Sequence, residues 1–260
     1  MPELSAAERR SQIAQMVIEN GKIYVNDLVD LFNVTETSIR RDLTLLEDGK
    51  RLRRIHGGAI PLPGSFRTDS FAEKKELHIR IKERIGKVAA EMVRQKDIIL
   101  LDSGTTTLQV VRHIPSPLRE NNLITLVTNS IPLAQEVLTW PSPNLTILGG
   151  IYLPDYQATV GPQTLAQLSE LTADIVFLGV DGLTLTTGAT TANVLMAEVG
   201  RMMVEHARRA VLVTDSTKIG RAGFAPVKTV ETFNTLITDA EAPAEVIKTI
   251  EDLGVEVILV

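Results

Sequence analysis

Five short polar segments carry the residue types best suited to binding a small molecule, and each directly follows an apolar run. The first, Asp102-Ser103-Gly104-Thr105-Thr106, combines a carboxylate, a flexible glycine and several hydroxyls at the predicted start of a helix. Hydroxyls and free backbone amides at such a helix start form a good phosphate cradle. Asp-Ser-Gly-Thr is also a common turn, so this segment alone leaves both interpretations open.

Four further segments occupy equivalent positions. Thr128-Asn129-Ser130 and Gly149-Gly150 follow the second and third apolar runs. Gly179-Val180-Asp181-Gly182 follows the fourth, and Asp215-Ser216-Thr217-Lys218 follows the fifth and places a carboxylate and an amine three residues apart. One such loop would be unremarkable. Five on one side of one sheet favour a pocket for a small, hydroxyl-rich anion.

Seven apolar, β-rich runs are the strands expected to position these segments. They lie at residues 98–101, 123–127, 145–148, 175–180, 210–213, 235–237 and 255–260. Helical stretches lie between most of them, for example at 165–171, 197–207 and 244–253. This alternation predicts an α/β fold with a largely parallel sheet covered by helices. Such sheets bind ligands beyond the carboxyl ends of their strands.

Residues 35–43 indicate a different chemistry. Thr35 suits a helix cap, and Ile39, Leu43 and Leu46 recur at the spacing of a helical inner face. The outer face carries hydroxyls and arginines, namely Thr37, Ser38, Arg40 and Arg41. Short hydroxyls at a helix start with arginines behind them suit a helix inserted into the DNA major groove. An ordinary solvated surface helix is the alternative.

The flanking sequence favours the DNA-binding interpretation. Helical runs at 9–20 and 26–32, a β-branched piece at 23–25 and a tight turn at 33–34 precede this helix, and Gly49 ends it. Residues 52–60 are predicted to form a small hairpin that turns at Gly57 and Gly58. This order of elements is that of a winged helix-turn-helix.

Basic residues gather around this helix and hairpin although the chain as a whole is acidic. Residues 1–61 hold nine basic and nine acidic residues, so the net charge of −5 falls on the rest of the chain. A local basic stripe is sufficient for phosphate contacts. The candidates, with the histidine of the wing, are Lys50, Arg51, Arg53, Arg54 and His56. A charged loop that only keeps the surface soluble is the alternative.

Length and composition favour two domains. A chain of 260 residues with 44% hydrophobic content can bury a sizeable core, and we predict domains at 1–60 and 76–260 with a linker at 61–75. A proline and glycine run at 61–65 marks that linker. Residues 70–95 then show an approximately helical period, which suits both a connector and the first helix of the second domain.

Several classes of site lack support. Cysteine is absent, which excludes disulfides and thiolate sites and fits a reducing cytoplasm. Neither a basic-then-apolar leader nor a bilayer-spanning stretch is found, so we expect a cytoplasmic protein with no membrane partner. No histidine and carboxylate cluster has metal-ligand spacing, and no metal or cofactor is expected.

Two motifs in the first domain resemble those of the DeoR-type bacterial repressors. That family carries Val-Ser-x-x-Thr-Ile-Arg-Arg-Asp-Leu followed by Leu-Arg-Arg-x-His-Gly-Gly-Ala. The corresponding segments here are residues 34–43 and 52–59. Thr35 and Ser38 replace the family's serine and threonine and keep the hydroxyl, so we expect an effect on operator choice at most.

The polar segments resemble the sensor domain of the same family, which is related to ribose-5-phosphate isomerase and the coenzyme A transferases. The matching segments are 102–106, 128–129, 179–182 and 215–218. The resemblance implies that hydroxyls and amides near Ser103 to Thr106 hold a phosphate. It also implies that four charged side chains face the sugar hydroxyls or carbonyl, namely Asp102, Asp181, Glu198 and Lys218. Gly200 replaces a lysine of many relatives, which bears on one polar contact and on the identity of the effector.

The resemblance implies a transcriptional regulator, most simply a repressor of carbohydrate metabolism genes. A dimer or tetramer would bind a double-stranded DNA operator, and a phosphorylated sugar or related metabolite in the second domain would control that binding. The alternative is a sugar-phosphate isomerase with an attached DNA-binding head, in which a carboxylate shuttles a proton beside a carbonyl. A DNA head is a poor companion for such an enzyme, and no histidine stands in the polar segments.

Overall fold

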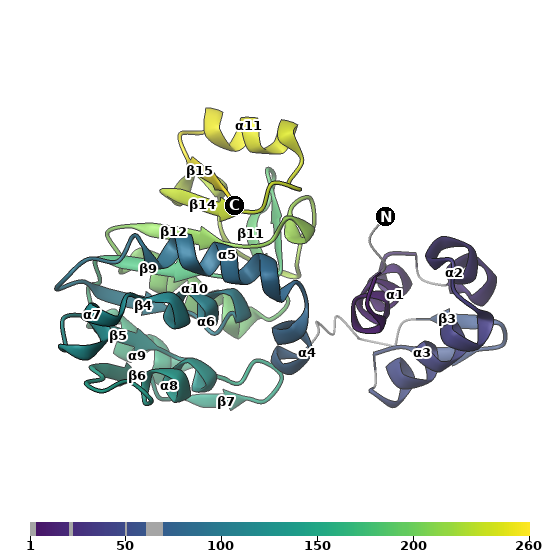
Figure 1. Cartoon of the computed structure of the whole chain (residues 1–260), viewed down its shortest axis with the longest axis horizontal. Helices are drawn as coiled ribbons and strands as arrows, with labels where there is room; N and C mark the ends of the chain where they lie inside the picture. The colour runs from purple at the N-terminus through teal and green to yellow at the C-terminus, as the bar shows by residue number, and fades with distance from the viewer. Residues whose placement is uncertain (1–3, 21–22, 50, 61–69) are drawn as a thin grey trace. The chain divides into compact units, whose positions relative to one another are not determined.

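The computed structural model describes residues 4–20, 23–49, 51–60 and 70–260, and the chain divides into two compact units, residues 1–69 and 70–260 (Figure 1). Most of the predicted linker, residues 61–69, lies outside the described residues. Its last part belongs to the second unit, where Ser70 and Glu73 form the capping box of helix α4 (Phe71–Glu76) and Phe71 is buried. The second unit therefore begins at residue 70 rather than 76, because this helix is capped and packed there.

The first unit, called the winged unit below, has the predicted winged helix-turn-helix arrangement. Its elements are α1 (Ala6–Asn20), β1 (Ile23–Tyr24), α2 (Val25–Phe32), α3 (Glu36–Asp48), β2 (Arg53–Ile55) and β3 (Gly58–Ile60). The strands form an antiparallel sheet in the order β1-β3-β2. Each helix contributes buried side chains to one core, with Ile13 from α1, Leu28 from α2, and Ile39, Leu43 and Leu46 from α3.

The wing hairpin turns one residue earlier than the sequence predicted. Ile55 pairs with Gly58, so the turn residues are His56 and Gly57, and Gly57 has the positive φ of 73° that favours glycine. Gly58 instead lies in β3, where an added Cβ would stand 2.1 Å from the backbone oxygen of Ile23. Glycine at position 58 thus lets β3 approach β1 closely enough to pair with it.

The second unit is built on a seven-stranded parallel sheet in the order β15-β14-β12-β9-β4-β5-β6. Its strands are β4 (Ile98–Leu101), β5 (Thr125–Thr128), β6 (Leu145–Ile147), β9 (Ile175–Leu178), β12 (Ala210–Val213), β14 (Thr235–Thr238) and β15 (Glu256–Leu259). These seven strands correspond to the seven apolar runs of the sequence. The prediction of a largely parallel α/β sheet is confirmed.

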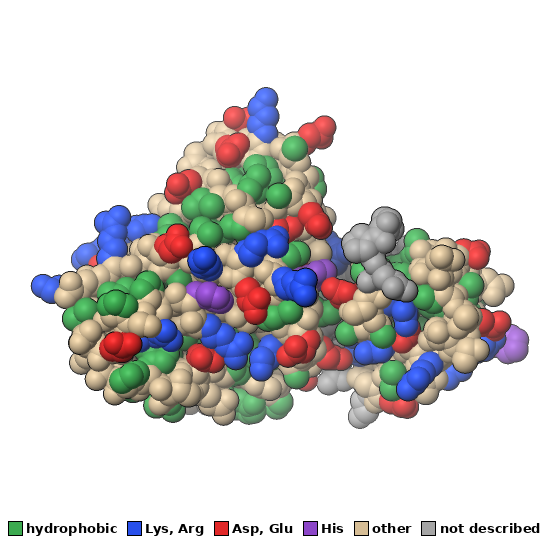
Figure 2. All heavy atoms as spheres, viewed as in Figure 1, with side chains coloured by type: hydrophobic (Ala, Val, Ile, Leu, Met, Phe, Trp, Pro, Cys, Tyr) green, Lys and Arg blue, Asp and Glu red, His purple; other side chains and the backbone are tan. Residues whose placement is uncertain are grey.

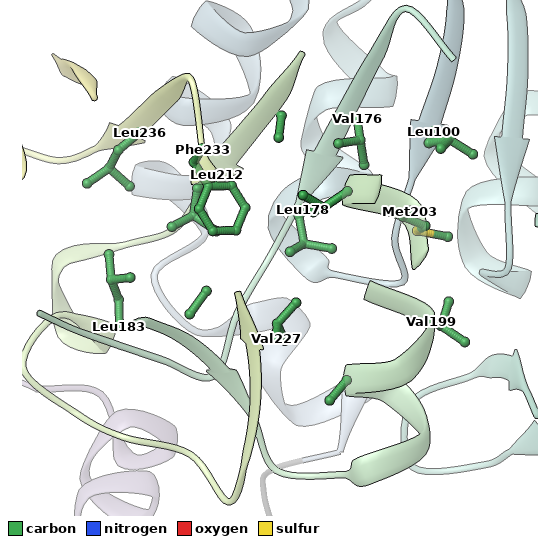
Figure 3. Close-up of a cluster of buried hydrophobic side chains, with 14 of the residues drawn as sticks. Leu100, Val176, Leu178, Leu183, Val199, Met203, Leu212, Val227, Phe233 and Leu236 are labelled. Carbon is green, nitrogen blue, oxygen red and sulfur yellow. The ribbon is translucent and has the colours of Figure 1, made fainter. Parts of the chain in front are cut away.

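Helices cover both faces of this sheet. They are α4, α5 (Ile79–Ala90), α6 (Thr105–His113), α7 (Ser116–Glu120), α8 (Ile131–Val137), α9 (Pro162–Ser169), α10 (Val194–Glu205) and α11 (Ala244–Asp252). Ile99 and Phe177 pack with α5, α6 and α8 on one face. Their strand neighbours Leu100 and Leu178 pack with α10 and α11 on the other, and Figure 3 shows part of this second cluster. Successive side chains of a strand point to opposite faces of the sheet. Because helices cover both faces, the side chains on both are apolar.

The direction in which strands are added reverses at the centre of the sheet. From β4 the chain adds β5 and β6 on one side, and then returns to add β9, β12, β14 and β15 on the other side of β4. Open α/β sheets bind ligands at such a reversal point, beyond the carboxyl ends of the two strands concerned. Here these ends are followed by Asp102 after β4 and Gly179 after β9.

Five short strands were not predicted from the sequence. They are β7 (Ile151–Leu153), β8 (Ala158–Val160), β10 (Gly182–Thr184), β11 (Gly188–Thr191) and β13 (Ala225–Lys228). The last three form a separate antiparallel sheet in the order β10-β11-β13. Each of the five has only three or four residues, which is too short for an apolar period to identify it, and pairing with a neighbouring strand defines it. Among the described residues, none of the helices has the length and apolar character needed to cross a membrane.

Candidate DNA-binding surface and ligand site

Helix α3 begins at Thr35, as predicted, because Thr35 is its N-cap. The backbone N–H of Ser38 donates to Thr35 Oγ1 over 3.3 Å, and the two hydroxyl oxygens lie 2.9 Å apart. The hydroxyls of Thr35 and Ser38 therefore bond to each other and cap the helix. Thr37 is exposed on the same turn. Of the three predicted hydroxyls, Thr37 is the one that capping leaves available.

The arginines of the winged unit have different partners. Arg40 forms an exposed ion pair with Glu36, one helical turn earlier, with Nη2 and Oε1 2.5 Å apart. Arg54 Nη1 donates to Thr44 Oγ1 over 2.7 Å, which joins the wing to α3. Arg41 and Arg53 are exposed and have no ion-pair or hydrogen-bond partner for their side chains within the described part of the chain. Of the described arginines of this unit, these two are left available.

The remaining predicted DNA contacts divide by position. Arg51 is half-buried, and its backbone N–H continues the end of α3 by donating to Leu46 O over 2.8 Å. His56 is exposed at the tip of the wing. Lys50 lies outside the described residues. Arg53, Arg54 and His56 thus belong to the wing, whereas Arg51 follows the helix.

Sequence analysis overlooked a buried acid in the winged unit. Asp42 lies on the inner side of α3, where Oδ2 is 2.7 Å from Arg9 Nε and Oδ1 is 3.4 Å from Arg10 Nη1. Both arginines belong to α1, so this triad joins α1 to α3. The spacing carried the signal, because Asp42 follows Ile39 by three residues and therefore shares its buried face.

Asp102 occupies the reversal point of the second unit with its carboxylate fully engaged. Gly104 N–H and the Thr107 hydroxyl donate to Oδ1 over 2.9 and 2.7 Å, and Gly179 N–H donates to Oδ2 over 2.9 Å. The last bond links the end of β4 to the end of β9. Burial raises the pKa of Asp102 to about 6, although these hydrogen bonds oppose that change.

The predicted phosphate cradle forms the start of α6, after the N-cap Gly104. Ser103, Thr105 and Thr106 are buried, and the Gly104 amide is already used by Asp102. Thr107, which the sequence analysis did not include, donates its hydroxyl to Asp102 and to Gly104 O. The structure therefore couples this helix start to Asp102 rather than leaving all its amides free.

A cavity of about 30 Å3 adjoins Asp102 and Gly179, and it has room for about one water-sized group. It is lined by Asp102, Asn129, Leu178, Gly179, Thr191, Met196, Val199, Gly200 and Val227. Asn129 is fully buried, and its Nδ2 donates to Thr159 O over 2.8 Å, which fixes the orientation of the amide. Its Oδ1 has no hydrogen-bond partner among the described residues. A buried acceptor of this kind indicates a donor that the protein itself does not supply.

Gly200, which replaces a lysine of many relatives, belongs to the apolar wall of this cavity. An added Cβ would stand 3.2 Å from Val227 Cγ1 and 3.4 Å from Leu178 Cδ1. Figure 3 shows Leu178, Val199 and Val227 in this region, contributed by β9, α10 and β13. A side chain at position 200 would therefore press on these apolar neighbours.

A charged cluster lies at the same edge of the sheet, and we define it as Lys74, Lys82, Asp181, Asp215 and Lys218. Lys74 Nζ forms an ion pair with Asp181 Oδ1. Asp181 Oδ2 also accepts hydrogen bonds from the Thr191 hydroxyl and Ala192 N–H, over 2.9 and 3.0 Å. Burial alone would raise the pKa of Asp181, but Lys74, Lys218 and the Ala192 N–H lower it to about 2.

The other members of the cluster are less completely paired. Lys82 Nζ donates to Lys74 O, and burial lowers the pKa of Lys82 to about 8. Burial opposes ionisation of Asp215, but Lys218 and the bond from Thr217 keep its pKa below the usual value. Burial likewise lowers the pKa of Lys218, which has no side-chain hydrogen bond or ion pair among the described residues. Two carboxylates thus share the cluster with three lysines.

Three predicted site residues have other surroundings. Thr128 Oγ1 donates to Leu101 O over 2.7 Å, which joins β5 to β4. Gly182 is buried in β10, where an added Cβ would stand 2.3 Å from Arg221 O. Glu198 is half-buried on α10 and does not line the cavity, and its carboxylate has no hydrogen-bond partner in the described part of the chain. The structure brings Asp102, Asn129 and Gly179 together, and Asp181, Asp215 and Lys218 together.

Sequence reasoning missed Lys74 and Lys82. Lys74 lay within the predicted linker, where no signal distinguished it from other lysines. Lys82 stands three residues after Ile79 and three before Ile85, so its spacing places a lysine on the apolar side of α5. Such a lysine needs a buried partner, and that requirement could have identified it. The described residues contain no group of three or more metal-ligating side chains.

Two family profiles match the chain. The DeoR-like helix-turn-helix domain matches residues 9–62, and the DeoR C terminal sensor domain matches residues 77–240. The chain is 33% identical to the HTH-type transcriptional regulator GlpR of Haloferax volcanii over 97% of both chains. It is 32% identical to a putative aga operon transcriptional repressor of Escherichia coli O157:H7, over 98% of this chain and 94% of that one. The glycerol-3-phosphate regulon repressor of Escherichia coli K12 is 26% identical over 96% and 97%.

Solved structures share parts of the fold. Ribose 5-phosphate isomerase A from Methanocaldococcus jannaschii aligns with a TM-score of 0.40 and 19% identity over 54% of each chain. A probable sor operon regulator from Shigella flexneri aligns with a TM-score of 0.45 and 12% identity over 68% of this chain and 90% of that one. Likenesses at this level support no functional conclusion.

The full-length relatives are named as transcriptional regulators and not as enzymes, so the isomerase alternative is not favoured. Both family domains occur in the chain, in the order of a DNA-binding head followed by a sensor domain. The winged unit supplies the DNA-binding fold, and the α/β unit supplies a buried polar site. The chain belongs to the DeoR family of transcriptional regulators.

Proposed function

We propose that this regulator is a repressor whose operator binding is controlled by a small phosphorylated metabolite at the carboxyl edge of the second unit. The unequal charge of the cluster carries this proposal, because its three lysines share two carboxylates, and Lys218, although near Asp215, forms no ion pair among the described residues. A phosphate group would supply negative charge and several strong acceptors for lysine.

The DNA contacts follow from the available cations of the winged unit. In this proposal helix α3 lies in the major groove, with Arg41 and Thr37 near the bases or phosphates. Arg40 would leave its ion pair with Glu36 and contact the DNA instead. In this proposal Arg53, Arg54 and His56 of the wing contact the phosphate backbone of the DNA, together with Lys50 and Arg51. Operators read by such heads are commonly two-fold symmetric, so we propose a dimer or tetramer.

One hydroxyl group of the effector would enter the small cavity. Asn129 Oδ1 is a buried acceptor without a partner among the described residues, and a hydroxyl group is a suitable donor for it. A phosphorylated sugar or polyol combines such hydroxyls with a phosphate. The names of two relatives, a glycerol-3-phosphate regulon repressor and a putative aga operon repressor, support this class.

Control of DNA binding requires the effector to bind one state of the protein better than another. Thermal unfolding of the full-length protein with glycerol 3-phosphate and with pentose and hexose phosphates tests the effector class. Glycerol and the unphosphorylated sugars are the matched controls. At ~100 times its dissociation constant a ligand stabilises the native state by about 2.7 kcal/mol. Stabilisation by unphosphorylated compounds alone, or by none, would contradict the phosphorylated class.

A hit must also change DNA binding. The full-length protein selects its preferred duplex from a randomised pool, and the affinity for that duplex is then measured with and without the stabilising compound. We expect the affinity to change at least about ten-fold, in line with typical coupling energies. A compound that stabilises the protein and leaves DNA affinity unchanged would not be an effector.

A further inference from the structure

Helix α4 links the charged cluster to the chain segment that leads to the winged unit. Lys74 on α4 pairs with Asp181, and both side chains are largely buried, at 17% and 13% exposure. Lys74 Nζ also lies 5.7 Å from the centre of the Tyr156 ring. The residue that follows Asp69 along the chain, Ser70, caps this same helix. One short helix therefore touches the cluster and stands at the start of the second unit.

Three contacts hold α4 on the second unit. The buried Phe71 donates its N–H to Asp155 O over 2.6 Å. Lys82 Nζ donates to the backbone oxygen of Lys74, and Lys74 Nζ pairs with Asp181. The buried Phe71 ring and its backbone bond offer nothing to an anion, whereas the ammonium groups of Lys82 and Lys74 do. The ion pair is the contact in which an anionic ligand can take the place of a carboxylate.

The two partners of this ion pair depend on it unequally. Asp181 retains two other donors, the Thr191 hydroxyl and Ala192 N–H, so its carboxylate stays bonded without Lys74. The Lys74 ammonium has no second hydrogen-bond acceptor among the described residues and therefore needs an anion. Thr191 also lines the small cavity, so one donor to Asp181 belongs to the cavity wall. Lys82 and Lys218 lie close enough to Lys74 to repel it, so an anion bound to the cluster would also be near Lys74.

We propose that Lys74 is an effector-binding residue, and that an anionic effector replaces Asp181 as its partner and loosens α4 from the second unit. This proposal rests on the proposed function, since it requires an anionic effector. Residues 61–69 join α4 to the winged unit, so a change at α4 moves the point from which the DNA-binding head is connected. In this proposal Lys74 both binds the effector and, by releasing Asp181, changes the attachment of α4 when the effector is bound.

Affinity for a defined anion separates this role from a structural one. The full-length protein is titrated with glycerol 3-phosphate and with inorganic phosphate, as wild type, K74Q and D181N. Loss of a charge-assisted bond in K74Q weakens anion binding by about ten-fold or more. D181N removes the carboxylate that competes for Lys74, so it strengthens anion binding. K75Q is the matched control, because Lys75 lies on the same helix without an ion pair among the described residues.

Opposite signs in K74Q and D181N support the exchange, whereas a purely structural ion pair would weaken binding in both variants. Equal affinities of wild type and K74Q for a bound anion would overturn the role of Lys74 and leave the proposed function intact. Failure of both anions to bind wild type, together with a flat screen of phosphorylated sugars, would instead overturn the proposed function and this inference with it.

Hydrogen exchange tests the loosening of α4 directly. Amides of residues 71–77 exchange faster in wild type once the anion binds, and faster in D181N without any ligand. Helix α11 provides the internal control, because it belongs to the same unit and, among the described residues, has no hydrogen bond or ion pair with the cluster. Unchanged exchange in α4 on saturation with the anion would overturn the proposal.

Discussion

The two units of this protein use buried acids in opposite ways. In the winged unit both oxygens of Asp42 meet arginines of α1, so the acid is saturated and joins two helices. In the second unit Asp181 and Asp215 share a cluster with three lysines, and Lys218 has no ion pair among the described residues. Figure 2 shows basic and acidic side chains interspersed over the visible face of the larger unit.

The two units also differ in the exposure of their cations that lack an ion pair among the described residues, and this exposure bears on the size of the partner each can bind. In the winged unit the unpaired cations, Arg41 and Arg53, are exposed and can meet an extended polyanion such as DNA. In the second unit the ammonium of Lys218 is half-buried and forms no ion pair among the described residues, so we expect a small anion as its ligand. The exposure of these cations is the reason to expect a large partner at one unit and a small one at the other.

The largest effect is expected from breaking the triad of Asp42, Arg9 and Arg10. Asp42→Ala leaves Arg9 largely buried without its carboxylate, which should cost about 3–5 kcal/mol of the free energy of unfolding of the winged unit. Urea unfolding followed by hydrogen exchange in α1 and α3 measures this loss. Asp48→Ala is the control, since Asp48 is exposed at the end of the same helix and should change stability by less than about 0.5 kcal/mol. Equal effects of both variants would contradict a structural role for Asp42.

The pH dependence of the second unit should distinguish its two buried acids. The pKa of Asp102 rises from 3.8 to about 6 on folding, so its contribution to stability is present below pH 3.8 and is lost as the pH rises through 6. Asp181 has a folded pKa of about 2, so its contribution is present above pH 3.8 and is lost as the pH falls towards 2. Each change corresponds to about 2–3 kcal/mol.

The unfolding free energy of each variant, followed by fluorescence of the buried Trp140, measures these changes. Asp102→Asn should flatten the pH dependence between pH 4 and 6, and Asp181→Asn should flatten it between about 2 and 4. If Asp102→Asn retained the wild-type slope between pH 4 and 6, the assigned pKa of Asp102 would be wrong.

Removal of an exposed cation should affect DNA binding without affecting stability. Arg41→Ala should weaken operator binding by about 1–3 kcal/mol and leave affinity for a stabilising metabolite unchanged. A base contact would also relax sequence specificity, whereas a phosphate contact would weaken all duplexes alike and reduce the salt dependence. Arg94→Ala, at an exposed arginine of the second unit, is the control. An unchanged DNA affinity of Arg41→Ala would mean that α3 is not the recognition helix.

The smallest expected effect concerns the start of α3. Thr35→Ala removes the cap that accepts the Ser38 N–H and should cost about 1 kcal/mol of stability. Thr35→Ser keeps the hydroxyl and should remain within a few tenths of a kcal/mol of wild type. Thermal unfolding followed by circular dichroism measures both variants. A loss in Thr35→Ser equal to that in Thr35→Ala would show that the cap hydroxyl is not the cause.

Much of the fold was predictable because local pattern and final position agree. Each apolar run of the second unit became a strand of the parallel sheet, since both faces of such strands are buried. Thr35 and Gly49 delimit α3 because capping is a local interaction. The short strands β10, β11 and β13 were missed, because each has only three or four residues and β13 pairs with β11 across a long separation in the chain.

The candidate site was predictable only in part. Position after a strand was sufficient to bring Asp102 and Gly179 together, because all carboxyl ends of a parallel sheet meet at one edge. The same reasoning could not show that the Thr128 hydroxyl would donate a hydrogen bond to Leu101 O of the neighbouring strand, or that Glu198 would lie outside the cavity. Whether a polar side chain is free or engaged depends on neighbours from other elements.

The sequence by itself determined the two units, the helix α3, the parallel sheet and the edge at which its polar residues gather. Each of these depends on hydrophobic period and capping, which act over a few residues. Only the tertiary structure decided that Asp42 is saturated by α1 and that Lys74 reaches Asp181, 107 positions away in the chain. Charge pairing across a fold depends on packing geometry, because burial makes an unpaired charge costly wherever its partner lies in the sequence.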